Sequence, residues 1–369
     1  MINNIPFFNY PLVFSQRKKE YLDVIEKVHS KGAFIMQEEL EEFEYQLSNF
    51  LKVNHVYGVA DGTMAILLSL LASGIKEGDE VILPAHTFVA TAAAVNHTGA
   101  IPVLADCNKE HLIDPESVKQ KISDKTKAIL PVQLNGRVCD MDAIEKLAKK
   151  NNLIIIEDSC QALGASFKGR YAGTFGKAGT FSFFPAKTLG CFGDGGAVIT
   201  DDDEIAVKIE MLRDHGRDQD SGKVKVYGYN SRLDNVQAAI LSVKLKYYES
   251  DINIRRDLAM IYNDRLKNLS KIDLPPEPEN QKHYDIYQNY EIEADDRDNL
   301  KKFLEKQGIG TILQWGGYTL NNFEDLDLNC ELEYTDKMRK RYLMLPMHHM
   351  LKNEEIHYIC DQIESFYYD

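Results

Sequence analysis

The amino-acid sequence predicts an α/β protein with a mostly parallel sheet. Between about residues 62 and 158, stretches with helical spacing alternate with short, uninterrupted apolar runs. This alternation is typical of a parallel sheet that helices cover on both faces. In such a sheet the functional side chains lie beyond the carboxyl ends of the strands. At 369 residues the chain is also long enough for a second, smaller domain.

The predicted elements of this sheet follow one another in a regular order. Helical spacing in "GTMAILLSLLAS" predicts a helix, and the apolar run in "DEVILPA" predicts a buried strand. In chain order we expect a helix over 62–73, a strand over 79–85, a helix over 88–99, a strand over 100–106, a helix over 114–123, a strand over 127–133, a helix over 141–152 and a strand over 153–158. Four strands separated by helices therefore form the expected sheet.

A smaller C-terminal unit is expected after the sheet. Residues 234–269 form a long amphipathic helical stretch, which the proline-rich run "LPPEPEN" at 274–280 ends. Beyond it we expect a strand over 284–294, a helix over 297–307 and two terminal helical stretches. The predicted domains are therefore a large α/β domain of residues 1–250 and a small C-terminal α/β domain of residues 251–369.

Composition excludes several classes of function. The formal net charge of -14 leaves no broad basic surface for nucleic acid. The longest apolar stretches, such as 65–72, are too short to span a bilayer, and the N-terminus lacks the pattern of a signal peptide. The six cysteines are scattered without a C-x-x-C pair, which fits a reducing cytosol and neither a zinc site nor a disulfide framework. We therefore expect a cytoplasmic protein with neither nucleic-acid nor membrane partners.

One lysine occupies an unusual place in the chain. Lys187 stands between the aromatic run "FSFFPA" and the glycine-rich turn "TLGCFGDGG". Taken alone it could be a surface lysine, the commonest kind, and Asp158 at the end of "LIIIED" could be a helix N-cap. Taken together they suggest pyridoxal phosphate (PLP), which requires a lysine that forms a Schiff base and an aspartate that holds the pyridinium nitrogen.

Further residues could complete a PLP site. Gln161 follows Asp158 by three positions and could hydrogen-bond the 3-oxygen of the ring. Gly62 and Thr63 begin a predicted helix, whose N-terminal N–H groups and dipole favour a phosphate. Ser182 could add a hydroxyl to the same phosphate. Phe88, just past a strand, could stack on the ring or simply pack in the core, and "DGT" alone could be only a helix start.

The order of five motifs gives a specific resemblance. "DGTMA", "PAHTFVATA", "EDSCQALGA", "FSFFPAKTLGCFGDGGAV" and "GYNSRLDNVQAA" resemble the DegT/DnrJ/EryC1/StrS family of PLP-dependent sugar-nucleotide aminotransferases, over about residues 6–350. The resemblance implies the aspartate aminotransferase fold, also called PLP fold type I. It also implies a homodimer whose active sites lie at the subunit interface.

Matched position by position, the resemblance assigns a role to each candidate residue. The implied cofactor-binding set is Gly62, Thr63, Phe88, Asp158, Gln161, Ser182, Lys187 and Asn230. Asn230, which on its own could be a turn residue, matches the asparagine that reaches the phosphate from the other subunit. Relatives with histidine in place of the lysine are dehydratases, so Lys187 implies transamination.

Two segments depart from the family pattern. Leu163 replaces the histidine of "QAHGA", so a polar substrate contact is missing there, and "TILQWGGYTLNNF" replaces a "HYP"-like motif. Trp315 in that segment could pack against the domain or line the substrate pocket. His348 lies where relatives often carry a histidine close to the substrate. His348 and His349 have no third ligand at a suitable spacing, so we expect no metal.

The function implied by the resemblance is amino transfer to a sugar. The expected donor is L-glutamate, and the expected acceptor is the keto carbon, C4 or C3, of a nucleotide-linked keto-6-deoxyhexose, with dTDP as the expected nucleotide. The product would serve cell-surface polysaccharide or glycoconjugate synthesis. The alternative is a non-catalytic regulatory or sugar-nucleotide-binding protein, against which the intact set of Lys187, Asp158 and Gln161 argues.

Overall fold

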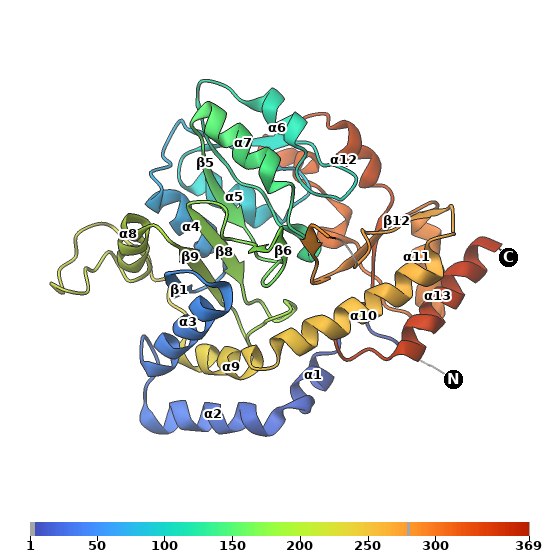
Figure 1. Cartoon of the computed structure of the whole chain (residues 1–369), viewed down its shortest axis with the longest axis horizontal. Coiled ribbons are helices and arrows are strands. Elements are labelled where there is room, and N and C mark those ends of the chain that lie inside the picture. Colours follow the sequence, from blue (N-terminus) through green and yellow to red (C-terminus); the bar gives the residue numbers. More distant parts are fainter. Residues whose placement is uncertain (1–3, 279–280, 369) are drawn as a thin grey trace.

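The structure, a computed structural model, describes residues 4–278 and 281–368. Its centre is a seven-stranded sheet with the strand order β1-β9-β8-β5-β4-β2-β3. Figure 1 labels four of these strands, β1, β9, β8 and β5. The strands are β1 (His55–Val59), β2 (Glu80–Pro84), β3 (Ile101–Ala105), β4 (Thr126–Ile129), β5 (Ile154–Asp158), β8 (Ala178–Ser182) and β9 (Gly196–Thr200). From β8 to β3 all neighbours are parallel, whereas β9 and β1 add antiparallel pairings. The predicted mostly parallel α/β sheet is confirmed.

Helices cover both faces of this sheet because alternate strand residues point to opposite sides. On β2, Ile82 packs into one hydrophobic cluster, whereas its neighbours Val81 and Leu83 pack into another. The cluster on the first face also contains residues of α3 (Glu38–Leu51), α6 (Pro115–Lys121), α7 (Met141–Asn151) and α9 (Asn235–Leu245). The clusters on the second face contain residues of α4 (Gly62–Ala72), α5 (Val89–His97) and α8 (Asp203–Arg213). Apolar side chains therefore shield both faces of the sheet from water, as strands that are apolar on both sides require.

The eight elements predicted between residues 62 and 158 are all present, with ends that shift by a few residues. The sequence analysis did not predict the helices before them, α1 (Tyr10–Gln16), α2 (Lys18–Lys31) and α3. Helix α2 lies against α9 (Figure 1). Among the described residues no helix is long and apolar enough to cross a bilayer.

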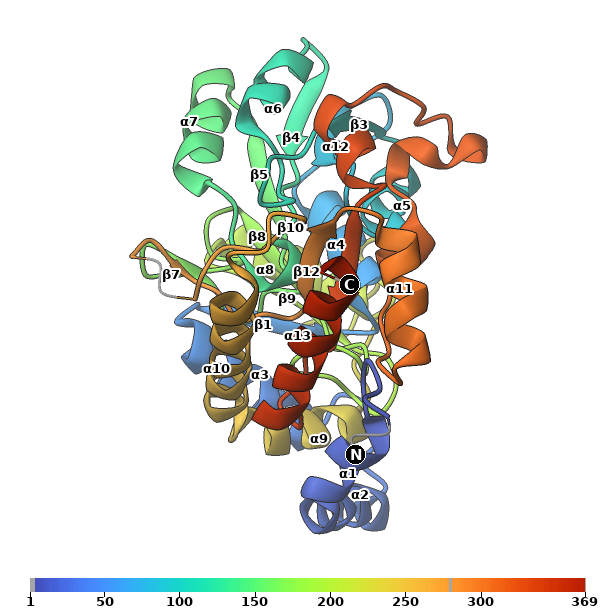
Figure 2. The same ribbon diagram turned by 90° about the vertical axis from the view of Figure 1, so that its right-hand side faces the viewer.

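The C-terminal part is built on a small antiparallel sheet. Its strands are β10 (Ile272–Asp273), β12 (Tyr290–Ala294) and β13 (Tyr342–Leu345), in the order β10-β12-β13. Helix α13 (Asn353–Tyr368) lies between α10 (Tyr248–Leu266) and α11 (Arg297–Lys306), as Figure 2 shows. The strand expected over 284–294 is shorter in the structure, since only the part from Tyr290 to Ala294, strand β12, belongs to this sheet.

Short elements complete the chain. A second three-stranded sheet joins β11 (His283–Tyr284) to β6 (Ser166–Phe167) and β7 (Arg170–Tyr171). The remaining pieces are α12 (Glu333–Met338) and the 3-10 turns η1 (Leu134–Gly136), η2 (Gln314–Gly317), η3 (Leu320–Asn322) and η4 (Glu324–Leu326). Turns η1 and η2 carry residues of the site described below.

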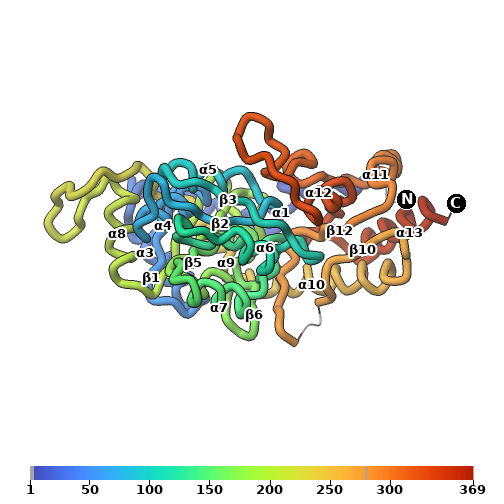
Figure 3. The backbone as a smooth tube through the Cα atoms, turned by 90° about the horizontal axis from the view of Figure 1, so that it is seen from above, coloured from blue at the N-terminus to red at the C-terminus, as the bar shows by residue number. Residues whose placement is uncertain are grey.

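Helix α10 connects the two cores. The long helical stretch expected over 234–269 is two helices, α9 and α10, with a break after Leu245. Tyr248 at the start of α10 packs in the core of the large sheet, whereas Tyr262 and Leu266 near its end pack in the core of the small sheet. Figure 3 shows the large and small parts side by side along the molecule. A domain boundary at residue 250 remains a prediction.

Candidate active site

A pocket opens beyond the carboxyl ends of β2, β4 and β5, where a parallel sheet presents functional side chains. Its volume is about 360 Å³. Its lining includes eight of the candidate residues, and they are Gly62, Thr63, Phe88, Asp158, Gln161, Ser182, Lys187 and Trp315. Residues from distant parts of the sequence thus meet at one edge of the sheet.

Lys187 lies in the loop between β8 and β9, and its side chain lines the pocket. The backbone N–H of Lys187 donates a 2.8 Å hydrogen bond to the carbonyl of Phe184, which closes a tight turn. Burial lowers the pKa of the Lys187 amine, and the neighbouring Cys160 and Asp158 act more weakly in the opposite direction. A partly desolvated amine of lowered pKa is the form of lysine that can attack a carbonyl carbon.

Asp158 is the last residue of β5 and is buried. The hydroxyl of Thr91 donates to its Oδ2 at 2.8 Å, and the N–H of Cys160 donates to its Oδ1 at 3.2 Å. Asp158 is therefore not a helix N-cap, because the donors to its carboxyl group are a hydroxyl of α5 and the backbone N–H of a turn residue. The two bonds fix the direction of the carboxyl group, which lines the pocket.

Gln161 is held in one orientation. Its Oε1 accepts hydrogen bonds from the backbone N–H of Asn135 at 2.9 Å and from Nδ2 of Asn289 at 3.2 Å. An amide oxygen with two such donors fixes which end of the side chain is which. The NH₂ group of Gln161 is the end left to donate toward the pocket, as a contact to a phenolic oxygen requires.

Gly62 lies where no side chain fits. A Cβ atom at this position would be 2.8 Å from Cβ of Ser182 and 2.9 Å from Sγ of Cys160. Asp61 caps helix α4 by accepting a 2.8 Å hydrogen bond from the N–H of Met64. Glycine at the first helical position therefore leaves the helix N-terminus open to the pocket, where N–H groups and the helix dipole favour a phosphate.

Two aromatic residues form one wall of the pocket. Phe88 is half-exposed at the start of α5, and its ring centroid is 6.3 Å from that of Trp315. Trp315 lines the pocket, with a left-handed backbone (φ 49°) in turn η2 and a ring 5.1 Å from that of His86. Trp315 also packs against the core of the large sheet, so it lies both against the domain and on the pocket wall, and a contact with the substrate remains a prediction.

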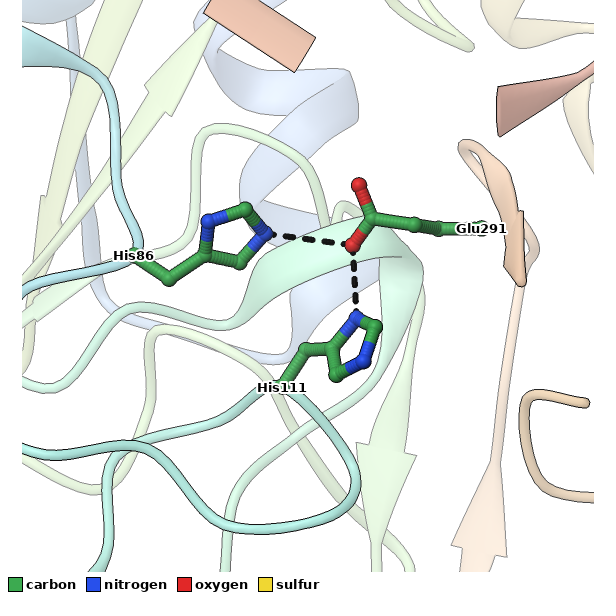
Figure 4. A group of neighbouring side chains, drawn as sticks. All are labelled: His86, His111 and Glu291. Atoms are coloured by element: carbon green, nitrogen blue, oxygen red, sulfur yellow. Dashed lines mark hydrogen bonds and ion pairs between the residues drawn. The ribbon is translucent and has the colours of Figure 1, made fainter. Parts of the chain in front are cut away.

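The side chains of His86 and His111 meet at the buried carboxylate of Glu291 (Figure 4). Oε1 of Glu291 accepts hydrogen bonds from Nε2 of His86 at 3.1 Å, from Nδ1 of His111 at 2.7 Å and from Nδ2 of Asn135 at 3.1 Å. One ring nitrogen of each histidine and one carboxylate oxygen of Glu291 lie within 4.8 Å of one another, as metal ligands also can. Because three N–H groups converge on the same oxygen, we interpret the cluster as a hydrogen-bonded carboxylate that supports Asn135.

The charges of this cluster are coupled. Burial lowers the pKa of His111, but its hydrogen bonds to Glu291 and Glu293 outweigh burial and raise the pKa to about 9. Burial raises the pKa of Glu291, but the two histidines outweigh it, so the net shift is downward. His111 is therefore an imidazolium at neutral pH, paired with carboxylates on β12.

Two candidate residues lie outside the pocket of their own chain. Asn230 is exposed at the base of a hairpin, where it bridges to Asp214. His348 is buried after β13, with its ring 5.7 Å from the ring of Phe8, and burial lowers its pKa to about 4. For these two residues, a role at the cofactor or the substrate remains a prediction.

Sequence reasoning missed several residues that complete the site. Thr91 orients Asp158, while Asn135 and Asn289 orient Gln161. Thr91 lies in "PAHTFVATA" one turn into the helix after a strand, which was a signal that could have found it. Asn289 directly precedes β12 of the small sheet, and no motif in the neighbouring sequence predicts its role in the site.

These residues fit PLP, and comparison with known proteins identifies the class. The chain matches the model of the DegT/DnrJ/EryC1/StrS aminotransferase family over residues 15–364 and therefore belongs to that family. It is a PLP-dependent aminotransferase, and its relatives include transaminases named for nucleotide-linked sugars. The amine of Lys187, the carboxylate of Asp158 and the open N-terminus of α4 are the groups that suit the cofactor.

Three particular proteins illustrate the relationship. The chain is 39% identical, over 99% of both chains, to the pleiotropic regulatory protein of Geobacillus stearothermophilus. It is 38% identical to dTDP-3-amino-3,4,6-trideoxy-alpha-D-glucose transaminase of Streptomyces venezuelae, over 84% of this chain and 82% of the relative. The crystal structure of S. venezuelae DesV in complex with a ketimine intermediate is 33% identical over 99% of both chains, with a TM-score of 0.95. This likeness confirms the expected aspartate aminotransferase fold.

Proposed function

We propose that the protein transfers an amino group from L-glutamate to the keto carbon, C3 or C4, of a nucleotide-linked keto-6-deoxyhexose. The observation that carries the proposal is the convergence of Lys187 and Asp158 on one pocket that also contains the N-terminus of α4. The S. venezuelae transaminase is named for a dTDP-linked 3-amino sugar, which supports dTDP as the nucleotide and C3 as the position. The choice of dTDP as the nucleotide and of C3 as the aminated position is part of the proposal.

Each residue of the pocket would have its own role in cofactor binding or in proton transfer. When bound, PLP supplies an electron sink for the carbon attached to the transferred nitrogen. We assign to Nζ of Lys187 both the attachment of the cofactor and proton transfer at the reacting carbon, since burial lowers its pKa and raises its neutral fraction. Asp158 would keep a proton on the ring nitrogen, and Gln161 would donate to the 3-oxygen. Ser182 and the N–H groups of Gly62 and Thr63 would bind the phosphate.

The proposal is tested by a substrate panel. The purified protein is incubated with L-glutamate and with dTDP-, UDP- and GDP-linked 3-keto and 4-keto sugars, and the new amine is located by NMR. We expect amination of a dTDP-linked 3-keto-6-deoxyhexose. Lys187→Ala and Lys187→Arg should abolish turnover, because neither side chain offers a primary amine at this site. Turnover by either variant would contradict the assignment of Lys187.

We further propose that the enzyme is a homodimer with shared sites. The hairpin between Asp214 and Asn230 extends away from the rest of the chain in Figures 1 and 3, beside α8. It exposes large apolar side chains, those of Val224, Val226, Tyr227 and Tyr229. Exposed apolar side chains gathered on one segment favour a covering partner. A second copy would bring Asn230 to its neighbour's phosphate, which explains why this residue lies outside its own pocket.

The setting of the reaction is also part of the proposal. All six cysteines are free, which supports a reducing compartment such as the cytoplasm. The amino sugar would be used for cell-surface polysaccharide or another glycoconjugate.

A regulatory role is the second candidate. It is favoured by the names of relatives such as the pleiotropic regulatory protein of G. stearothermophilus. The two candidates are separated by replacing the chromosomal gene with one that encodes Lys187→Ala. A regulatory function independent of catalysis would survive this change, whereas loss of the amino sugar and of the phenotype together would assign both to the enzyme.

A further inference from the structure

The side-chain amide of Gln288 holds the two peptide groups on either side of Lys187. Its Oε1 accepts a 2.7 Å hydrogen bond from the N–H of Thr188, and its Nε2 donates a 2.9 Å hydrogen bond to the carbonyl of Ala186. Gln288 is 7% exposed, so water does not compete for these groups. Both ends of one planar amide are therefore used on one short segment of the loop.

These two bonds restrict the backbone of Lys187. The carbonyl of Ala186 belongs to the peptide plane before Lys187, and the N–H of Thr188 belongs to the plane after it. Only the φ and ψ angles of Lys187 separate the two planes. Tying both planes to a rigid amide fixes these angles, and with them the direction of the Cα–Cβ bond from which the lysine side chain starts.

Gln288 is in turn held by a buried cation. Nη1 of Arg255 donates to the carbonyls of Tyr287 at 3.0 Å, Gln288 at 3.3 Å and Met347 at 2.9 Å. Arg255 is 2% exposed and belongs to α10. It therefore joins the segment before β12 to the segment after β13, and it fixes the backbone from which Gln288 reaches the loop.

We propose that Gln288 is a positioning residue for Lys187, and that it makes the geometry of the lysine depend on the placement of the small sheet against the large one. Gln288 precedes β12 of the small sheet, whereas Lys187 belongs to the loop between β8 and β9 of the large sheet. The inference rests on the proposed function of Lys187. It assigns Gln288 a role in the reaction without contact with the reacting atoms.

The first test is Gln288→Met in the full-length, PLP-loaded enzyme. Methionine keeps the length of the side chain but can neither donate to Ala186 nor accept strongly from Thr188. We expect kcat to fall by about 10- to 100-fold, the range for a misplaced catalytic group, with KM for the sugar nucleotide unchanged. Borohydride trapping of PLP on Lys187, measured by peptide mass spectrometry, should slow in parallel. Gln307→Met, in the same domain, is the matched control and should match wild type.

The second test is Gln288→Glu, which separates positioning from folding. The carboxylate still accepts from Thr188, but its second oxygen faces the carbonyl of Ala186 and repels it. Protonation restores a donor at that oxygen. Burial raises the pKa of a carboxyl group above its ordinary value of about 4.3, so we expect the ratio of variant to wild-type kcat, and of trapping rates, to increase as the pH falls from about 8 to 5. Loss of packing alone would not produce a ratio that changes with pH.

The outcomes distinguish this inference from the function on which it rests. Wild-type kcat and trapping rate in Gln288→Met, or wild-type values in a folded Gln288→Glu variant at every pH from about 5 to 9, would overturn the positioning role. In that case loss of trapping in Lys187→Ala would still support the proposed function. If the wild-type enzyme aminates no keto sugar of the panel, the proposed function itself is wrong, and if Lys187→Ala retains PLP trapping and turnover, the assignment of Lys187 is wrong.

Discussion

Thr91 donates a 2.8 Å hydrogen bond to Asp158, and this bond joins helix α5 to the end of strand β5. The hydroxyl of Thr87 is in turn 2.8 Å from that of Thr91, so two hydroxyl groups precede the carboxylate in a short chain of hydrogen bonds. All three residues are buried. The carboxylate therefore has a fixed direction at the point where a pyridine nitrogen would meet it.

Asp158→Asn should weaken PLP binding and lower kcat by about 100-fold, because an amide cannot stabilise a protonated ring nitrogen as a carboxylate does. The measurements are PLP titration by absorbance and steady-state kinetics. Thr91→Val, which keeps the carboxylate but removes its donor, should cost less. If Asp158→Asn transaminates at the wild-type rate, Asp158 has only a structural role.

Gly62→Ala should impair cofactor binding without unfolding the protein. Its Cβ would lie 2.8 Å from Ser182 and 2.9 Å from Cys160, and overpacking of this kind costs about 1–3 kcal/mol. We expect the Kd for PLP to rise by about 10- to 100-fold. Gly193→Ala is the control, since its Cβ would meet only the side chain of Gln237 at 3.3 Å. Equal affinity in the two variants would show that the phosphate does not use this helix end.

Mixed dimers should reveal whether Asn230 serves the partner's site. Lys187→Ala and Asn230→Asp are each expected to be inactive, the second because an aspartate would face the phosphate charge. After subunit exchange, the heterodimer of a symmetric enzyme would carry both lesions in one site and neither in the other, so each heterodimer should recover about half of the wild-type activity. No recovery after proven exchange would assign Asn230 to its own chain or to no site.

The imidazolium of His111 should make stability depend on alkaline pH. Its pKa is raised from an ordinary 6.5 to about 9, so its contribution is complete below pH 6.5, declines between these values and is lost above pH 9. His111→Gln should therefore cost about 1–3 kcal/mol of unfolding free energy at pH 6 and much less at pH 10. Urea unfolding across this range measures the difference, with the exposed His97→Gln as control. A difference that stays constant with pH would mean that His111 is uncharged in the folded protein.

Much of the large sheet could be predicted because its pattern is local. Strands such as β5 are continuous apolar runs, and helices such as α7 show regular apolar spacing. The break between α9 and α10 could not be predicted, since amphipathic spacing continues through Lys246 and no Gly or Pro marks it. Strand β13 was missed for another reason, because "YLML" is short and has no alternation to separate it from a helix.

The site was predictable only in part. Lys187, Asp158 and Gln161 stand next to strand ends, where chemistry is expected, and the family pattern selected them. Asn289 binds Gln161 across 128 positions, and Gln288 binds the two neighbours of Lys187 across 100 and 102 positions. Glu291 acts through Asn135, which in turn binds Gln161. Contacts of this kind depend on how the small sheet packs against the large one, and no local pattern encodes that packing.

Helix α10 also bears on how the chain folds. Its first turns are part of one core and its last turns part of the other, while Ile5, near the opposite end of the sequence, is buried in the second core. No single cut of the chain would leave each half with a complete hydrophobic interior. Melting should therefore be cooperative across the whole molecule, and calorimetry should record one heat-absorption peak instead of two.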